Sequence, residues 1–176
     1  GAGIGLFTLF AIETNKEIKT LSVEANPEVF RILKENLEFH QNFNLDKVIL
    51  NKAVSNYPDE IKFFVPTGDD FSYGSIEKSY LDKQQIQYRE IFLETTNLEE
   101  FKDMSFEIIK IDVEGSELDV LLAIQHFLDS CSYLFIEIMK KNKQSVFKLL
   151  ADNEFKLLID SRDDIGNYIF TKNITS

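Results

Sequence analysis

Hydrophobic residues recur along this chain with two periods, one typical of amphipathic helices and the other of strands. Helical spacing predicts helices over residues 6–13, 26–40, 98–101, 116–128 and 144–151. Alternating or continuous apolar runs predict strands over residues 18–24, 48–50, 61–65, 91–95, 106–112, 133–138, 155–159 and 168–171. Strands that alternate with helices indicate an α/β protein with a mainly parallel sheet covered by helices on both faces. The two closing strands favour an antiparallel C-terminal strand.

Local signals mark several of these boundaries. Asn26 before Pro27 is a good N-cap followed by a residue tolerated at the first helical position. Ser116 and Asp119 have the spacing of a capping box. The run over residues 106–112 is the strongest buried-strand signal in the chain, and residues 57–59 read as a turn.

The segment over residues 66–89 lacks a regular period. Connections of this length are uncommon in compact domains and often form lids or binding loops. We expect this loop to cover a site, with Ser72, Tyr73 and Ser75 toward the substrate.

The chain opens on the turn sequence Gly1-Ala2-Gly3-Ile4-Gly5. Turns of this kind normally follow a strand. We therefore expect residues 1–176 to form a single domain, truncated at its N-terminus, whose first strand is missing.

Composition excludes several classes of protein. A net charge of −11 without a basic cluster disfavours a nucleic-acid partner, because such binding needs a basic surface. No apolar run of the length needed for a membrane span is present. Cys131 is the only cysteine, which excludes an intramolecular disulfide and favours the cytoplasm.

The glycine turn and an acid after the next strand form the first chemical signal. Glycines allow tight turns and close approach of a ligand, and a helix N-terminus presents free N–H groups. Glu24 lies about 20 residues beyond the turn, where a carboxylate can accept hydrogen bonds from ribose hydroxyls. Leu6 stands near the place of a third glycine, which disfavours a pyrophosphate loop. This pair alone does not separate NAD from S-adenosylmethionine.

A second group of acids follows the strand at 106–112. Ligands of open α/β sheets bind at the carboxyl ends of strands. Asp112 could hold an amino group, a substrate hydroxyl or a metal ion, and Glu114 is the better candidate for a general base. For Glu117 we favour a role in capping the next helix and complementing its dipole.

Four segments together resemble the FkbM-type methyltransferase family. They are Gly1-Ala2-Gly3-Ile4-Gly5-Leu6-Phe7-Thr8, Val23-Glu24-Ala25-Asn26-Pro27-Glu28, Asn51-Lys52-Ala53-Val54-Ser55 and Ile109-Lys110-Ile111-Asp112-Val113-Glu114-Gly115-Ser116-Glu117. The resemblance implies a Rossmann-like class I methyltransferase fold. It also implies S-adenosylmethionine-dependent transfer to a hydroxyl of a sugar, glycan or natural product.

By position, the resemblance assigns residues to parts of the cofactor. Gly1, Gly3 and Gly5, with Ala2 between them, would line its methionine part. Glu24 would bind the ribose, Ala25 and Asn26 the nucleoside side, and Ala53 and Val54 the adenine edge. From its place at a strand end, and not from the resemblance, Asp112 is counted among the cofactor-binding candidates as well as the catalytic ones.

Three alternatives stay open. Asp112, Glu114 and Glu137 could surround Mg²⁺, which is possible but not favoured, so no metal site is assigned. An NAD-dependent oxidoreductase or epimerase would share the glycine turn, but Tyr80 and Lys83 are one residue short of its usual Tyr-x-x-x-Lys pair. A catalytically inactive nucleoside- or partner-binding domain is the third.

Overall fold

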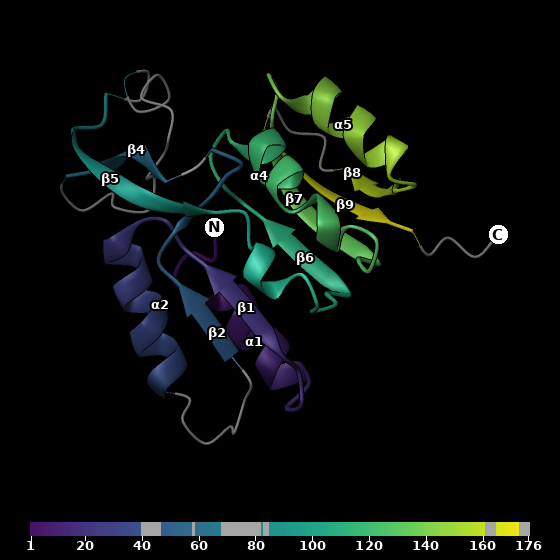
Figure 1. Ribbon diagram of the computed structural model, residues 1–176, viewed down its shortest axis with the longest axis horizontal. Coiled ribbons are helices and arrows are strands. Elements are labelled where there is room, and N and C mark those ends of the chain that lie inside the picture. The colour runs from purple at the N-terminus through teal and green to yellow at the C-terminus, as the bar shows by residue number, and fades with distance from the viewer. Residues whose placement is uncertain (40–46, 58, 68–81, 83–84, 161–164, 173–176) are drawn as a thin grey trace. The chain divides into compact units, whose positions relative to one another are not determined.

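The computed structural model describes residues 1–39, 47–57, 59–67, 82, 85–160 and 165–172. Figure 1 shows the order of the described helices and strands along the chain. The chain divides into two compact units, Gly1–Ala53 with Glu60–Glu94 and Val54–Asp59 with Thr95–Ser176.

The first unit begins with two helices and two parallel strands. They are α1 Leu6–Thr14, β1 Thr20–Val23, α2 Pro27–Phe39 and β2 Lys47–Leu50. Ile12 of α1 packs with Leu33 and Leu37 of α2, and Ile49 of β2 lies against this core. The helices and strands predicted here are confirmed. His40, predicted to end α2, lies outside the described residues.

The predicted N-cap of α2 is also confirmed. The Glu28 N–H donates a hydrogen bond of 3.0 Å to Asn26 Oδ1, while Pro27 is the first helical residue. This bond satisfies one of the backbone donors that a helix leaves unpaired at its start.

A three-stranded sheet follows, in the order β3-β5-β4. Its strands are β3 Ala53–Val54, β4 Glu60–Pro66 and β5 Tyr88–Thr96. β4 and β5 are antiparallel, and their pairing extends to Pro66 opposite Tyr88. The predicted loop over 66–89 was therefore too long, because its two ends pair as strands. An edge-to-face contact between Phe64 and Tyr88, with ring centroids 5.3 Å apart, packs this end of the ladder.

The second unit holds a four-stranded mixed sheet in the order β6-β7-β9-β8. Its elements are η2 Glu99–Phe101, β6 Ile108–Ile111, α4 Glu117–Ala123, η3 Gln125–Phe127, β7 Tyr133–Met139, α5 Lys143–Asp152, β8 Lys156–Asp160 and β9 Ile165–Thr171. β6 and β7 are parallel, whereas β9 is antiparallel to both β7 and β8. The antiparallel ending is confirmed. The fold is thus α/β with mixed sheets.

Two predictions in this unit were wrong. The run over 106–112 forms a strand, but Ile108 is 46% exposed and only Ile111 is buried, because β6 is an outer strand of this sheet as described. Ser116 is the N-cap residue of α4 but its side chain makes no cap hydrogen bond. Asp119 instead accepts a bond of 2.7 Å from Ser55 Oγ, so the capping box does not form.

Among the described helices, none combines the length and apolar character needed to cross a bilayer.

Candidate functional site

The glycine turn is held firmly against its surroundings in the first unit. Gly3 and Gly5 both have positive φ, +58° and +90°. A Cβ at Gly5 would lie 2.6 Å from Leu33 Cδ1, whereas a Cβ at Gly3 would meet no atom within 4 Å. The Ala2 N–H donates to the Val23 carbonyl at 2.9 Å, which ties the turn to the end of β1. Gly5 is therefore favoured by its positive φ and by the close approach of Leu33, while Gly3 leaves open space beside the turn.

Glu24 joins this turn to the end of β1. The Gly3 N–H donates to Glu24 Oε2 at 2.8 Å, and the Asn26 N–H donates to Oε1 at 2.9 Å. The side chain is largely buried, with 8% of its residue surface exposed. The structure thus brings the glycine turn and Glu24 together, as a shared site requires.

Asn51 supports the same corner, although its sequence position alone assigned it no role. Its Nδ2 donates to the carbonyls of Glu24, at 2.8 Å, and Ala25, at 3.0 Å. The signal that could have identified Asn51 is its position directly after β2. Leu50 pairs with Val23 in the parallel register, so Asn51 and Glu24 each follow the last residue of neighbouring strands. Carboxyl ends of parallel neighbours meet at one edge of a sheet.

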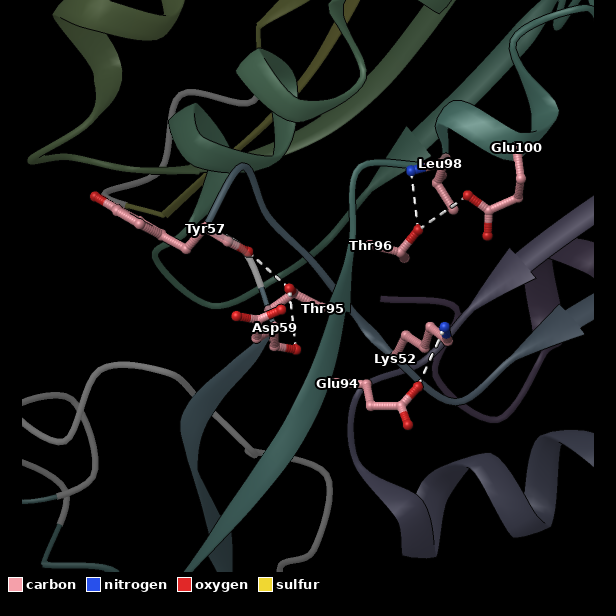
Figure 2. A network of polar contacts seen from close by, with 8 residues as sticks. All are labelled: Lys52, Tyr57, Asp59, Glu94, Thr95, Thr96, Leu98 and Glu100. Atoms are coloured by element: carbon pink, nitrogen blue, oxygen red, sulfur yellow. Dashed lines mark hydrogen bonds and ion pairs between the residues drawn. The ribbon is translucent and has the colours of Figure 1, made fainter.

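The residues next to the predicted adenine contacts are fixed by a network on β5 (Figure 2). Lys52 Nζ lies 3.2 Å from Glu94 Oε2, directly before buried Ala53. Further along, Thr95 Oγ1 donates to the Tyr57 carbonyl at 2.7 Å, and the Leu98 N–H donates to Thr96 Oγ1 at 2.9 Å. Apart from a bond of 3.5 Å from Thr96 Oγ1 to Glu100 Oε2, these hydroxyls bond backbone groups. The network therefore supports the chain around β3 and β5.

Three acids gather in the second unit. Carboxylate oxygens of Asp112, Glu114 and Glu137 all lie within 4.8 Å of one another, and each residue is partly buried. Asp112 Oδ2 forms an ion pair of 2.9 Å with Lys110 Nζ. Burial raises the pKa of Glu137, and the negative charge of Asp112 raises it further, while Lys110 opposes them. This cluster attracts positively charged or proton-donating groups.

Glu137 was weighed from the sequence only as a metal ligand. It lies in β7 between the buried residues Ile136 and Ile138, on the opposite face of the strand. A single acid at a half-buried position of an otherwise apolar strand is the signal that could have marked it.

The remaining sequence predictions have mixed outcomes. Ser72, Tyr73 and Ser75 lie outside the described residues. Cys131 is buried, and burial raises its thiol pKa to about 11. Glu117 begins α4 but is itself buried, which a role limited to the helix dipole does not explain.

Fold and site together define an α/β protein with mixed sheets, a carboxylate held by a glycine turn in one unit, and an acidic cluster in the other. Residues 1–160 match the family model described as Methyltransferase FkbM domain. The chain belongs to this family.

A comparison with solved structures agrees on the fold. The chain is similar to the crystal structure of methyltransferase FkbM from Methylobacillus flagellatus KT, with a TM-score of 0.67 and 14% sequence identity. The match covers 97% of this chain and 41% of that one, so the chain spans about two fifths of its length. No curated protein matches the chain.

Proposed function

We propose that this chain is a methyltransferase domain over residues 1–176 that uses S-adenosylmethionine to methylate a hydroxyl. The acceptor is a sugar, a glycan or a natural product, and the single cysteine favours a cytoplasmic location. Family membership supports methyl transfer. The observation that carries the cofactor assignment is the Glu24 carboxylate, held by two backbone N–H groups beside Gly3.

The residues of this corner fit an adenosyl group. A carboxylate has about four acceptor positions, and the backbone bonds to Glu24 occupy two. The other two can accept from the 2′ and 3′ hydroxyls of a ribose. Because an added Cβ at Gly3 meets nothing within 4 Å, the turn leaves room for a ligand to approach its backbone. In this proposal Gly1, Ala2 and Gly5 shape the turn, and Ala25, Asn26, Ala53 and Val54 serve the nucleoside.

The acidic cluster is assigned to the acceptor and to the amino-acid end of the cofactor. When bound, S-adenosylmethionine supplies an electrophilic methyl group on its sulfonium. Glu114 takes the proton of the acceptor hydroxyl as the oxygen–methyl bond forms, and Asp112 binds an ammonium or orients that hydroxyl. Holding the oxygen in line with the methyl group provides much of the acceleration.

Mg²⁺ is not favoured in this reaction. Asp112 already has a cationic partner in Lys110, 2.9 Å away, which competes for its oxygen. Transfer is therefore expected to continue at an unchanged rate in the presence of a chelator such as EDTA.

The test is a methyl-transfer assay with S-adenosylmethionine carrying a radiolabelled methyl group. Acceptors are a panel of monosaccharides, methyl glycosides and polyketide alcohols. Glu114→Gln is compared with Glu154→Gln, since Glu154 is an exposed glutamate that also has positive φ. We expect labelled ether products, a loss of about 100-fold or more for Glu114→Gln, and no loss for Glu154→Gln.

Two results would count against this proposal in different ways. A Glu114→Gln protein that transfers methyl groups at the wild-type rate removes Glu114 from the role of base. Binding of S-adenosylhomocysteine without transfer to any acceptor favours an inactive nucleoside-binding domain.

A further inference from the structure

The turn that carries Glu114 has an unusual backbone. Glu114 has a φ of +47° and Gly115, which follows it, a φ of +105°. Residues with a side chain rarely adopt positive φ, and they keep it where the surrounding structure holds them there. Something must therefore hold the Glu114–Gly115 peptide in place.

Glu117 and Asn142 hold both polar groups of the Gly115 backbone. The Gly115 N–H donates to Glu117 Oε1 at 2.8 Å, and Asn142 Nδ2 donates to the Gly115 carbonyl at 2.8 Å. Asn142 Nδ2 also donates to Glu117 Oε2, so the two side chains bond each other. We call Glu117 and Asn142 the clamp. Because Glu117 is only 1% exposed, water does not readily replace these bonds.

Neither clamp residue has the helix-capping or dipole-complementing role that its position at the start of a helix suggests. Asn142 is the N-cap residue of α5, yet its side chain makes no cap hydrogen bond there. Glu117 is the first residue of α4, where an exposed acid would be enough to complement the helix dipole. Both side chains turn toward Gly115 instead. The starts of two helices are thus used to hold one turn.

Gly115 is the residue that this arrangement requires. Its φ of +105° favours glycine. A Cβ at this position would also lie 3.1 Å from Lys141 Nζ and 3.2 Å from Met139 Sδ. The backbone is therefore held by the clamp on its polar groups and approached closely by two side chains.

We propose that Glu117 and Asn142 are positioning residues that fix the backbone on both sides of Gly115 and so keep the Glu114 carboxylate beside Asp112 and Glu137. The effect of this clamp on methyl transfer rests on the proposed function, in which Glu114 is the base. Without the clamp, Glu114 relaxes toward negative φ and its side chain leaves the cluster. The clamp itself touches neither cofactor nor acceptor in this account.

Asn142→Ala tests the clamp, with Asn153→Ala as its matched control. Asn153 is the C-cap residue of the same helix, and its Nδ2 donates to the Leu149 carbonyl at 2.8 Å. Both variants lose an amide that bonds a backbone carbonyl, but only one bond involves Gly115. Amide hydrogen exchange of Gly115 and the H–N–Cα–H coupling of Glu114, both from NMR, report the turn without any acceptor.

We expect Asn142→Ala to speed exchange of the Gly115 amide about 10-fold or more and to change the Glu114 coupling, while Asn153→Ala alters neither. With the best acceptor of the panel, kcat should fall about 10-fold or more while KM for S-adenosylmethionine stays unchanged. If Asn142→Ala does not fold, Glu117→Gln provides the second test. In this variant the side-chain oxygen can still accept from the Gly115 N–H, but an NH₂ group replaces the oxygen that accepts from Asn142 Nδ2. We therefore expect amide exchange and coupling to change in the same direction as in Asn142→Ala, but by less.

Wild-type exchange and coupling in a folded Asn142→Ala or Glu117→Gln protein would overturn the proposal. Equal changes in Asn153→Ala would do the same, because the effect would then come from α5 as a whole. If Asn142→Ala changes the turn but Glu114→Gln still transfers methyl groups at the wild-type rate, the clamp is supported and the role of Glu114 as base is refuted. The failures of the two proposals are therefore distinguishable.

Discussion

Replacing Glu24 by Gln separates the structural role of its carboxylate from a general effect of lost charge. Gln has nearly the same size but only one acceptor oxygen. One of the two N–H groups, from Gly3 or Asn26, must then face an amide NH₂. The other keeps a bond that no longer involves a charged acceptor. Since the site is 8% exposed, water compensates poorly.

The expected loss of stability follows from these two bonds. A hydrogen bond to a charged group contributes about 1.5–3 kcal/mol, and a buried donor left unpaired costs about 1–3 kcal/mol. We therefore expect Glu24→Gln to lower the free energy of unfolding by about 2–4 kcal/mol. Glu28→Gln is the control, because Glu28 pairs with Arg89 at 2.9 Å where both side chains are about half exposed. Such a pair contributes at most about 1 kcal/mol.

Urea denaturation followed by circular dichroism measures both variants without ligand. With a slope of about 2 kcal/mol per molar urea, in the middle of the usual range, the Glu24→Gln midpoint should fall by roughly 1–2 M, well beyond that of Glu28→Gln. Equal midpoints for the two variants would show that the Glu24 carboxylate does not hold the glycine turn.

Three further predictions concern packing and ionisation. Gly5→Ala should destabilise by about 2–4 kcal/mol in thermal unfolding, from its positive φ and the 2.6 Å approach to buried Leu33 Cδ1. Because burial raises the Cys131 pKa to about 11, stability should fall as pH rises from about 9 to 11, and thiol reagents should label the folded protein slowly at neutral pH. Asp112→Asn should lower the raised pKa of Glu137, measured by carboxyl ¹³C NMR, since the charge of Asp112 is one cause of that shift.

The helices and strands that could be predicted are those marked by hydrophobic spacing within the element or by a capping residue next to it. The helix that starts at Pro27 is marked by Asn26 and by apolar residues at helical spacing, and both signals lie within the helix or next to it. The two residues of β3 are too few to show a period. The sequence places Tyr88 in a loop, whereas the structure pairs it with Pro66 as part of a strand. These two residues are 22 positions apart, and neither segment alone contains a pattern that predicts the pairing.

The residues of the candidate site also fall into two groups, those marked by a local sequence signal and those that depend on a contact distant in sequence. Glu24 could be predicted because its spacing from the glycine turn is a local signal. The clamp could not, since Asn142 contacts Gly115 from 27 residues away and occupies a position where an asparagine ordinarily caps its own helix. Asp119 illustrates the reverse error, because its distant partner Ser55 overrides the capping box that its spacing suggests.

Calorimetric titration with S-adenosylhomocysteine, and separately with NAD, tests the central claim that the corner of Gly3 and Glu24 binds the adenosyl group of S-adenosylmethionine. We expect saturable binding of S-adenosylhomocysteine at one site. Affinity should be weaker by about 10-fold or more in folded Glu24→Ala and unchanged in Glu28→Ala. Binding of NAD alone, or S-adenosylhomocysteine binding Glu24→Ala as tightly as the wild type, would contradict it.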